Sequence, residues 1–299
     1  MNLQKDFLLG FLAPIVISFL LMLMTRPWKQ GDRILWLVPL VIALVYPVVL
    51  WFRLGNHVWP MTDSLDRLIV IVPAICVGIF LLMLFRARFD FYLLIVLLIG
   101  ALIVLGIRKT NSWSVWTLSI WIACAVIIVS AASKCAARFV KRDDSLFMPI
   151  LIAGTSFALA GYLCFTGSIT LGQSALPFSG AMIALLAISI IRKKSLLNST
   201  MITGIVMIFS IFLMSSLWWT SSSNPTESKL DFIESVFFLI LPLIAWMKFS
   251  PMLKNWKPTT RTIAITTLAA ILAGAVVGRK QYVTMKSLEE TNSYYDSEE

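Results

Sequence analysis

Polar side chains gather inside an otherwise apolar stretch at residues 166–191. Thr170, Gln173 and Ser174 supply two hydroxyls and one amide, and Pro177 follows them. Spacings of three and four place Thr170, Gln173 and Pro177 on one face of a helix. Because proline has no N–H, Pro177 leaves the Gln173 carbonyl without its helical partner. These four residues form a candidate site that binds a solute through neutral hydrogen bonds.

The same four residues also fit a purely structural role. A neighbouring helix or Ser174 can satisfy the Gln173 carbonyl, because backbone polar groups in lipid must find partners within the protein. Pro177 would then mark only a packed kink. The sequence leaves both interpretations open.

Two ionisable residues are further candidates, here for a proton or ligand gate. His57 is the only histidine, and it lies in the polar connection at 53–67. Asp63 and Asp66 in that connection are placed to cap the next helix. Glu234 is the carboxylate deepest in an apolar segment, but near the start of that segment it can reach the membrane interface.

The chain lacks the sequence patterns of an enzyme or a metalloprotein. Cys76, Cys124, Cys135 and Cys164 form no CxxC motif and no cluster with histidine, so we expect no disulfide and no metal site. There is no Gly-rich phosphate loop, no protease motif and no catalytic triad. We therefore expect a protein that is not an enzyme and that uses no cofactor.

The composition predicts a membrane protein. Hydrophobic residues make up 59% and charged residues 13% of the 299-residue chain, with a mean hydropathy of +0.88. Soluble domains carry about 25% charged residues. The net charge of +10 comes from short connections between apolar runs, which indicates membrane orientation and not nucleic-acid binding.

Ten apolar segments are long enough to cross a membrane as helices of about 17–25 residues. We predict an all-α, polytopic integral membrane protein with a bundle of about ten transmembrane helices in one domain, 1–280. The polar, acidic stretch 281–299 is expected to form a disordered tail. The segments are 7–24, 34–52, 67–85, 91–107, 113–133, 147–165, 168–191, 199–218, 232–249 and 262–278.

The distribution of basic residues predicts the orientation. The odd-numbered connections hold 16 of the 25 Lys and Arg residues. Basic connections stay in the cytoplasm, so both termini are expected outside. We expect the protein in the bacterial cytoplasmic (inner) membrane, in contact with membrane lipids.

Two functions are compatible with these features. The first is a small permease-like protein for an uncharged or amphipathic solute, with a path lined by the hairpin at 147–191. The second is a non-catalytic structural or accessory subunit that scaffolds a membrane protein partner or forms a homo-oligomer. Stripes of small residues favour close helix packing. These stripes are Gly154, Ala158 and Gly161, and Gly180, Ala184 and Ala187.

Overall fold

The computed structural model describes residues 8–24, 37–54, 64–85, 90–106, 114–143, 145–166, 169–219 and 225–296, and its regular elements in these ranges are all helices. In chain order they are the π-helix η1 (Leu8–Leu12), α2 (Ala13–Met24), α3 (Leu37–Leu54), α4 (Ser64–Phe85), α5 (Asp90–Gly106), α6 (Val115–Arg142), α7 (Phe147–Cys164), α8 (Ile169–Arg192), α9 (Ser199–Trp219), α10 (Pro225–Ile240), the 3-10 helices η3 (Leu241–Phe249) and η4 (Pro251–Leu253), and α11 (Pro258–Asp296).

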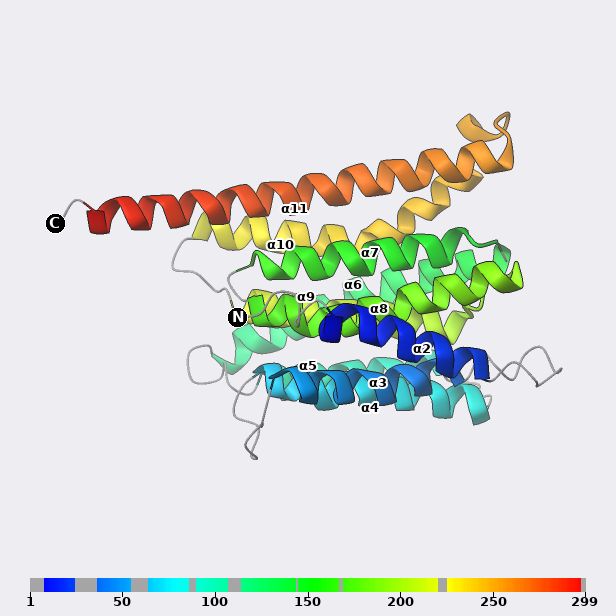
Figure 1. Cartoon of the computed structure of the whole chain (residues 1–299), viewed down its shortest axis with the longest axis horizontal. Helices are drawn as coiled ribbons and strands as arrows, with labels where there is room; N and C mark the ends of the chain where they lie inside the picture. The colour runs from blue at the N-terminus through cyan, green and yellow to red at the C-terminus, as the bar shows by residue number, and fades with distance from the viewer. Residues whose placement is uncertain are drawn as a thin grey trace.

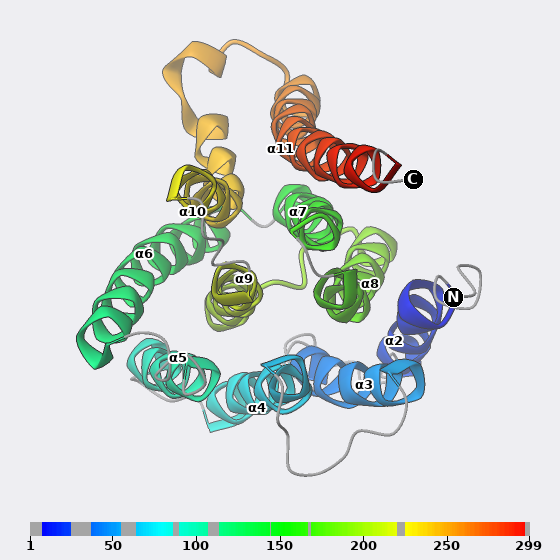
Figure 2. The ribbon, with the colours of Figure 1, turned by 90° about the vertical axis from the view of Figure 1, so that its left-hand side faces the viewer.

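The long helices lie side by side along one axis and form a bundle (Figure 1). Figure 2, which looks along that axis, places α9 inside a ring of neighbours. All residues from Met201 to Ser216 are buried, and α9 contacts α4, α5, α6 and α10. The hairpin of α7 and α8 completes the interior, whereas α11 lies at the rim against α7 and η3.

Seven helices of the described chain are long and apolar enough to cross a membrane. This agrees with the predicted all-α membrane bundle, but it does not confirm the count of about ten spans. Three further apolar helices, Gly10–Leu23, Leu37–Trp51 and Phe91–Gly106, coincide with predicted spans but are shorter. A helix of about 20 residues is needed to cross the hydrocarbon core.

The last two predicted spans differ most from the observed helices. α10 begins at Pro225, before the predicted start at 232, and it changes to the 3-10 helix η3 at Leu241. Pro242 explains this change, because it cannot donate to the carbonyl four residues earlier. α11 does not stop near residue 278 but continues through the polar stretch to Asp296.

One of the two small-residue stripes packs closely against a neighbouring helix, and the other does not. A Cβ added at Gly154 would meet nothing within 4 Å, so this face of α7 is open in the described structure. A Cβ at Gly180 would lie 3.0 Å from the Phe11 carbonyl oxygen, so that stripe meets η1 and α2. α7 and α8 approach each other closely at Gly172, where a Cβ would lie 2.5 Å from the Cys164 nitrogen.

Candidate functional site

The four predicted solute-binding residues lie together on α8. Thr170 and Gln173 are half-buried, and Ser174 and Pro177 are buried. α8 stays helical through Pro177 and packs against α7, α2 and α3. The Ser174 hydroxyl donates to the Leu171 carbonyl at 2.7 Å, so it is satisfied within its own helix.

A tyrosine from α3 adds to this region. Tyr46 is 1% exposed, and its hydroxyl lies beside Ser174. Within the described chain this hydroxyl has no hydrogen-bond partner. The structure thus adds one buried, unsatisfied hydroxyl to the predicted set, and solute binding at these α8 residues stays a prediction.

Of the two predicted gate residues, His57 lies outside the described residues, and Glu234 lies on α10. Four residues of α10 share one helical face, because successive members are three, one and three positions apart. They are Asp231, Glu234, Ser235 and Phe238. All four are buried. This face of α10 therefore buries two carboxylates.

Both carboxylates are paired with neighbouring cations from α11. The Arg279 Nε donates to Glu234 Oε1 at 2.6 Å, and Lys280 forms an ion pair with Asp231. Asp231 and Glu234 are only 6% and 7% exposed. The structure buries Glu234 against α11, and its predicted position near the membrane interface stays a prediction.

The pairing leaves polar atoms of the cluster unsatisfied. Glu234 Oε2 and Ser235 Oγ are buried and have no hydrogen-bond partner among the described residues. The Tyr162 hydroxyl of α7 lies beside both residues, and its ring packs on Phe238 with centroids 5.0 Å apart. An unsatisfied polar atom in apolar surroundings costs several kcal/mol. The cluster therefore offers a place for a water molecule or a hydrogen-bonding solute.

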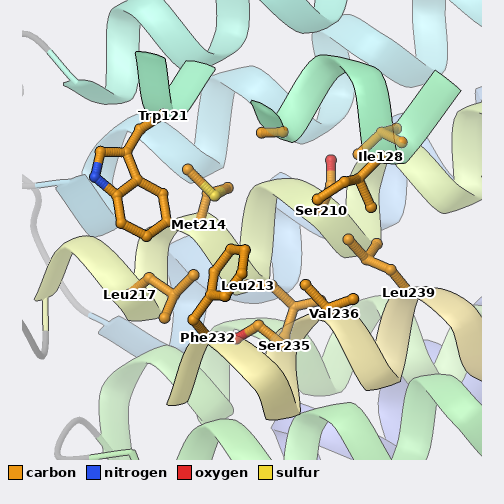
Figure 3. A pocket seen from close by; sticks show the side chains of 12 residues that line it. Trp121, Ile128, Ser210, Leu213, Met214, Leu217, Phe232, Ser235, Val236 and Leu239 are labelled. Carbon is orange, nitrogen blue, oxygen red and sulfur yellow. The ribbon is translucent and has the colours of Figure 1, made fainter. Parts of the chain in front are cut away.

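A small cavity adjoins Ser235 on the side of α10 that faces α6 and α9. It is enclosed by α6, α9 and α10, and Figure 3 shows Trp121, Phe232 and Ser235 on its wall. The Trp121 and Phe232 rings meet edge to face at 5.3 Å. The cavity volume of about 20 Å³ admits about one water molecule.

A second ion pair joins η3 to the end of α6. Lys248 of η3 lies 2.5 Å from Asp143 Oδ2 at the end of α6, and 3.1 Å from the Ser145 hydroxyl. Burial raises the pKa of the Asp143 carboxyl, but the hydrogen bonds from Lys248 and Ser145 outweigh it and hold that pKa below its usual value.

Aromatic and backbone contacts reinforce this second attachment. Trp246 Nε1 donates to the Cys135 carbonyl at 3.2 Å, and the Trp246 ring packs against Phe139. Arg261 donates to the Lys248 carbonyl at 2.9 Å, which ties the start of α11 to η3. The segment 225–296, comprising α10, η3, η4 and α11, is thus joined to α6 by polar contacts at one end and lies beside Tyr162 of α7 at the other.

Sequence reasoning identified Glu234 but missed Tyr162, Asp231, Arg279 and Lys280. Asp231 and Glu234 are three residues apart, and Arg279 and Lys280 are adjacent, so each pair could be recognised as a local charge cluster. No local pattern shows that the two clusters meet. That contact depends on the tertiary arrangement, in which α11 packs on α7 and η3 and brings its two cations to α10.

Comparison with protein families, curated proteins and solved structures finds no match to this chain.

Proposed function

We propose that the protein is a permease-like membrane carrier for an uncharged or amphipathic solute. In this proposal the segment 225–296 moves against α6 and α7 during transport. The supporting observation is the buried carboxylate of Glu234, which is paired with Arg279 and whose second oxygen has no partner in the described structure. Ionisable groups between apolar helices are costly, and proteins generally retain them for function.

The ion pair of Asp143 and Lys248 supports movement of this segment. A carrier must close one end of its path while the other end opens. Asp143 and Lys248 join the segment to α6 at one end, whereas the pairs of Glu234 and Asp231 with α11 lie within the segment, toward its other end. Breaking and re-forming interface salt bridges is a known way to switch between two packings.

A second candidate function is a scaffolding subunit, and one feature of α11 favours it. Ala270, Gly274 and Gly278 are four residues apart and exposed on one face of the helix. A Cβ at Gly274 or Gly278 would meet nothing within 4 Å. Small residues at this spacing let two membrane helices approach closely, so this face suits a partner helix or a second copy of the chain.

Osmotic swelling of proteoliposomes tests the carrier proposal across several classes of solute. Vesicles with and without the protein are mixed with isosmotic solutions of polyols, sugars, amides and zwitterionic amphiphiles, and swelling is followed by light scattering. The matched control replaces Trp121 of α6 and Phe232 of α10, whose rings are in contact, by cysteine in a background lacking the native cysteines. A short bis-maleimide then cross-links the segment 225–296 to α6.

We expect at least one solute class to swell the protein-containing vesicles faster than empty ones, and we expect the cross-link to remove this difference. Equal swelling of protein-containing and empty vesicles for every solute would contradict a carrier. A stable oligomer that Gly274→Leu dissociates would then favour the scaffolding function.

A further inference from the structure

A basic cavity opens between α5, α6 and α9, away from the ion-pair cluster of α10 and α11. Its volume is about 340 Å³. Lys134, Arg138 and Lys141 line one wall, four and three residues apart on one face of α6. The described lining residues include no carboxylate, and none of the described carboxylates pairs with these three side chains.

The wall opposite α6 is the first turn of α9. Ser199 and Thr200 line the cavity there. Asn198 caps this helix by accepting from the Met201 N–H at 2.8 Å. The N-terminal end of a helix carries a partial positive charge and attracts anions. Three cations, two hydroxyl-bearing residues and a helix N-terminus thus face the same space.

The third wall is aromatic and apolar. Phe91, Tyr92 and Leu94 of α5 line it, and the Lys134 Nζ lies 4.8 Å from the centroid of the Phe91 ring. Figure 2 shows α5 and α6 next to one another beside α9. A ligand that fills this cavity must therefore combine negative charge with an apolar part.

The length of α6 places the cavity at the depth of lipid headgroups. α6 has 28 residues, from Val115 to Arg142. About 20 residues cross the hydrocarbon core, so a helix that enters near Val115 leaves the core near Lys134. The three cations then lie in the headgroup layer, at the end of the bundle that the distribution of basic residues assigns to the cytoplasm.

We propose that this cavity binds an anionic phospholipid, with its phosphate held by Lys134, Arg138, Lys141 and the start of α9. The glycerol and the first acyl carbons lie against Phe91 and Tyr92. Basic recesses between membrane helices on the cytoplasmic side suit such headgroups. The bilayer supplies this ligand at high local concentration, whereas a soluble phosphate has no apolar part for the α5 wall.

The test is a titration of the purified protein with phosphatidylglycerol in a mild detergent, followed by native mass spectrometry and by melting temperature. Phosphatidylcholine and inorganic phosphate are titrated in parallel. The pocket variant is Lys134→Gln, Arg138→Gln and Lys141→Gln together. The matched control is Arg192→Gln, Lys193→Gln and Lys194→Gln, which removes the same charge elsewhere at the same end.

We expect phosphatidylglycerol to bind and to raise the melting temperature of the wild type more than phosphatidylcholine does. The pocket variant should bind it at least about tenfold more weakly, and the control should be close to wild type. If the triple variant does not fold, Arg138→Gln is compared with Arg192→Gln, with about a fivefold loss expected for Arg138→Gln only.

Three results would overturn the assignment. Equal binding of the two phospholipids would show that negative charge is not recognised. Equal weakening by the pocket and control variants would indicate a general charge effect. Inorganic phosphate that reproduces the stabilisation and displaces the lipid would assign the cavity to a soluble anion instead.

Discussion

At the scale of residues, the two partners of the central ion pair differ in exposure. The Glu234 side chain is 9% exposed and the Arg279 side chain 41%. Arg279→Gln leaves a charge buried, whereas Glu234→Gln leaves a cation that can turn toward solvent. We expect Arg279→Gln to lower the free energy of unfolding in detergent by about 1–3 kcal/mol. This loss is smaller than for a fully buried ion pair, because the guanidinium is partly exposed to solvent.

A double-mutant cycle isolates this interaction. Glu234→Gln alone should cost less than Arg279→Gln, and the double variant should be more stable than Arg279→Gln because no unpaired buried charge remains. Reversible unfolding in mixed micelles measures all four proteins. Additive losses would show that Glu234 and Arg279 do not act as a pair.

The ion pair at the other end predicts a pH dependence. In the folded protein the Asp143 carboxyl has a pKa below its usual value of 3.8. Its ionised form therefore contributes fully to stability above pH 3.8, and this contribution is lost as the pH falls through the pKa of the folded state. We expect the wild type to have a higher melting temperature than the Asp143→Asn variant at neutral pH. The difference between the two melting temperatures should shrink below about pH 4. A difference that stays constant into strong acid would argue against an ionised Asp143.

Single residues also show where sequence reasoning reaches its limit. Glu234 stood out because a carboxylate in an apolar segment is unusual. Its partner Arg279 is 45 residues away, and only tertiary packing joins them. Similarly, Lys134, Arg138 and Lys141 are among the 16 basic residues of the odd-numbered connections that predict the orientation, although the sequence also shows that their spacing places them on one helix face.

At the scale of elements, the α7–α8 hairpin depends on Gly172. An added Cβ there would lie 2.5 Å from the Cys164 nitrogen and 2.7 Å from its Cα, so backbone must shift. We expect Gly172→Ala to destabilise the protein by about 1–3 kcal/mol through overpacking. Thermal unfolding in detergent provides the measurement.

Gly154→Ala is the matched control for this substitution. It lies in the neighbouring helix, where a new Cβ meets nothing within 4 Å. Alanine has a higher helix propensity than glycine, by up to about 1 kcal/mol, so this variant should be neutral or slightly stabilised. Similar losses at Gly154 and Gly172 would contradict the close approach at Gly172.

Helix positions were predictable where apolar runs end at polar residues. The predicted segments 147–165 and 199–218 agree with Phe147–Cys164 and Ser199–Trp219 to within one residue at each end. Hydropathy failed for α11, because a helix can continue into water after its apolar part ends. It also could not show that Gly180 meets α2, since a stripe of small residues does not identify its partner.

At the scale of the whole molecule, the orientation remains a prediction, and α11 provides the means to test it. Met252 precedes this helix and is 88% exposed, and Tyr282 follows its apolar part and is 68% exposed. In a cysteine-free background, Met252→Cys should react with an impermeant maleimide only from the cytoplasm. Tyr282→Cys should react only from outside. The reverse pattern would invert the topology, and labelling of both from one side would show that α11 does not cross the membrane.

The central claim is that the segment 225–296 moves relative to α6–α8, and distances between paired spin labels test it most directly. One pair joins exposed Trp116 and Tyr282 at the predicted outer end, and another joins exposed Ile191 and Met252 at the inner end. The protein is reconstituted in lipid, with Asp231→Asn and Glu234→Gln as the perturbing variant. We predict two distance populations for each pair. In the variant, the outer pair should shift to longer distances and the inner pair to shorter ones. A single distance at both ends, unchanged in the variant, would contradict a moving carrier.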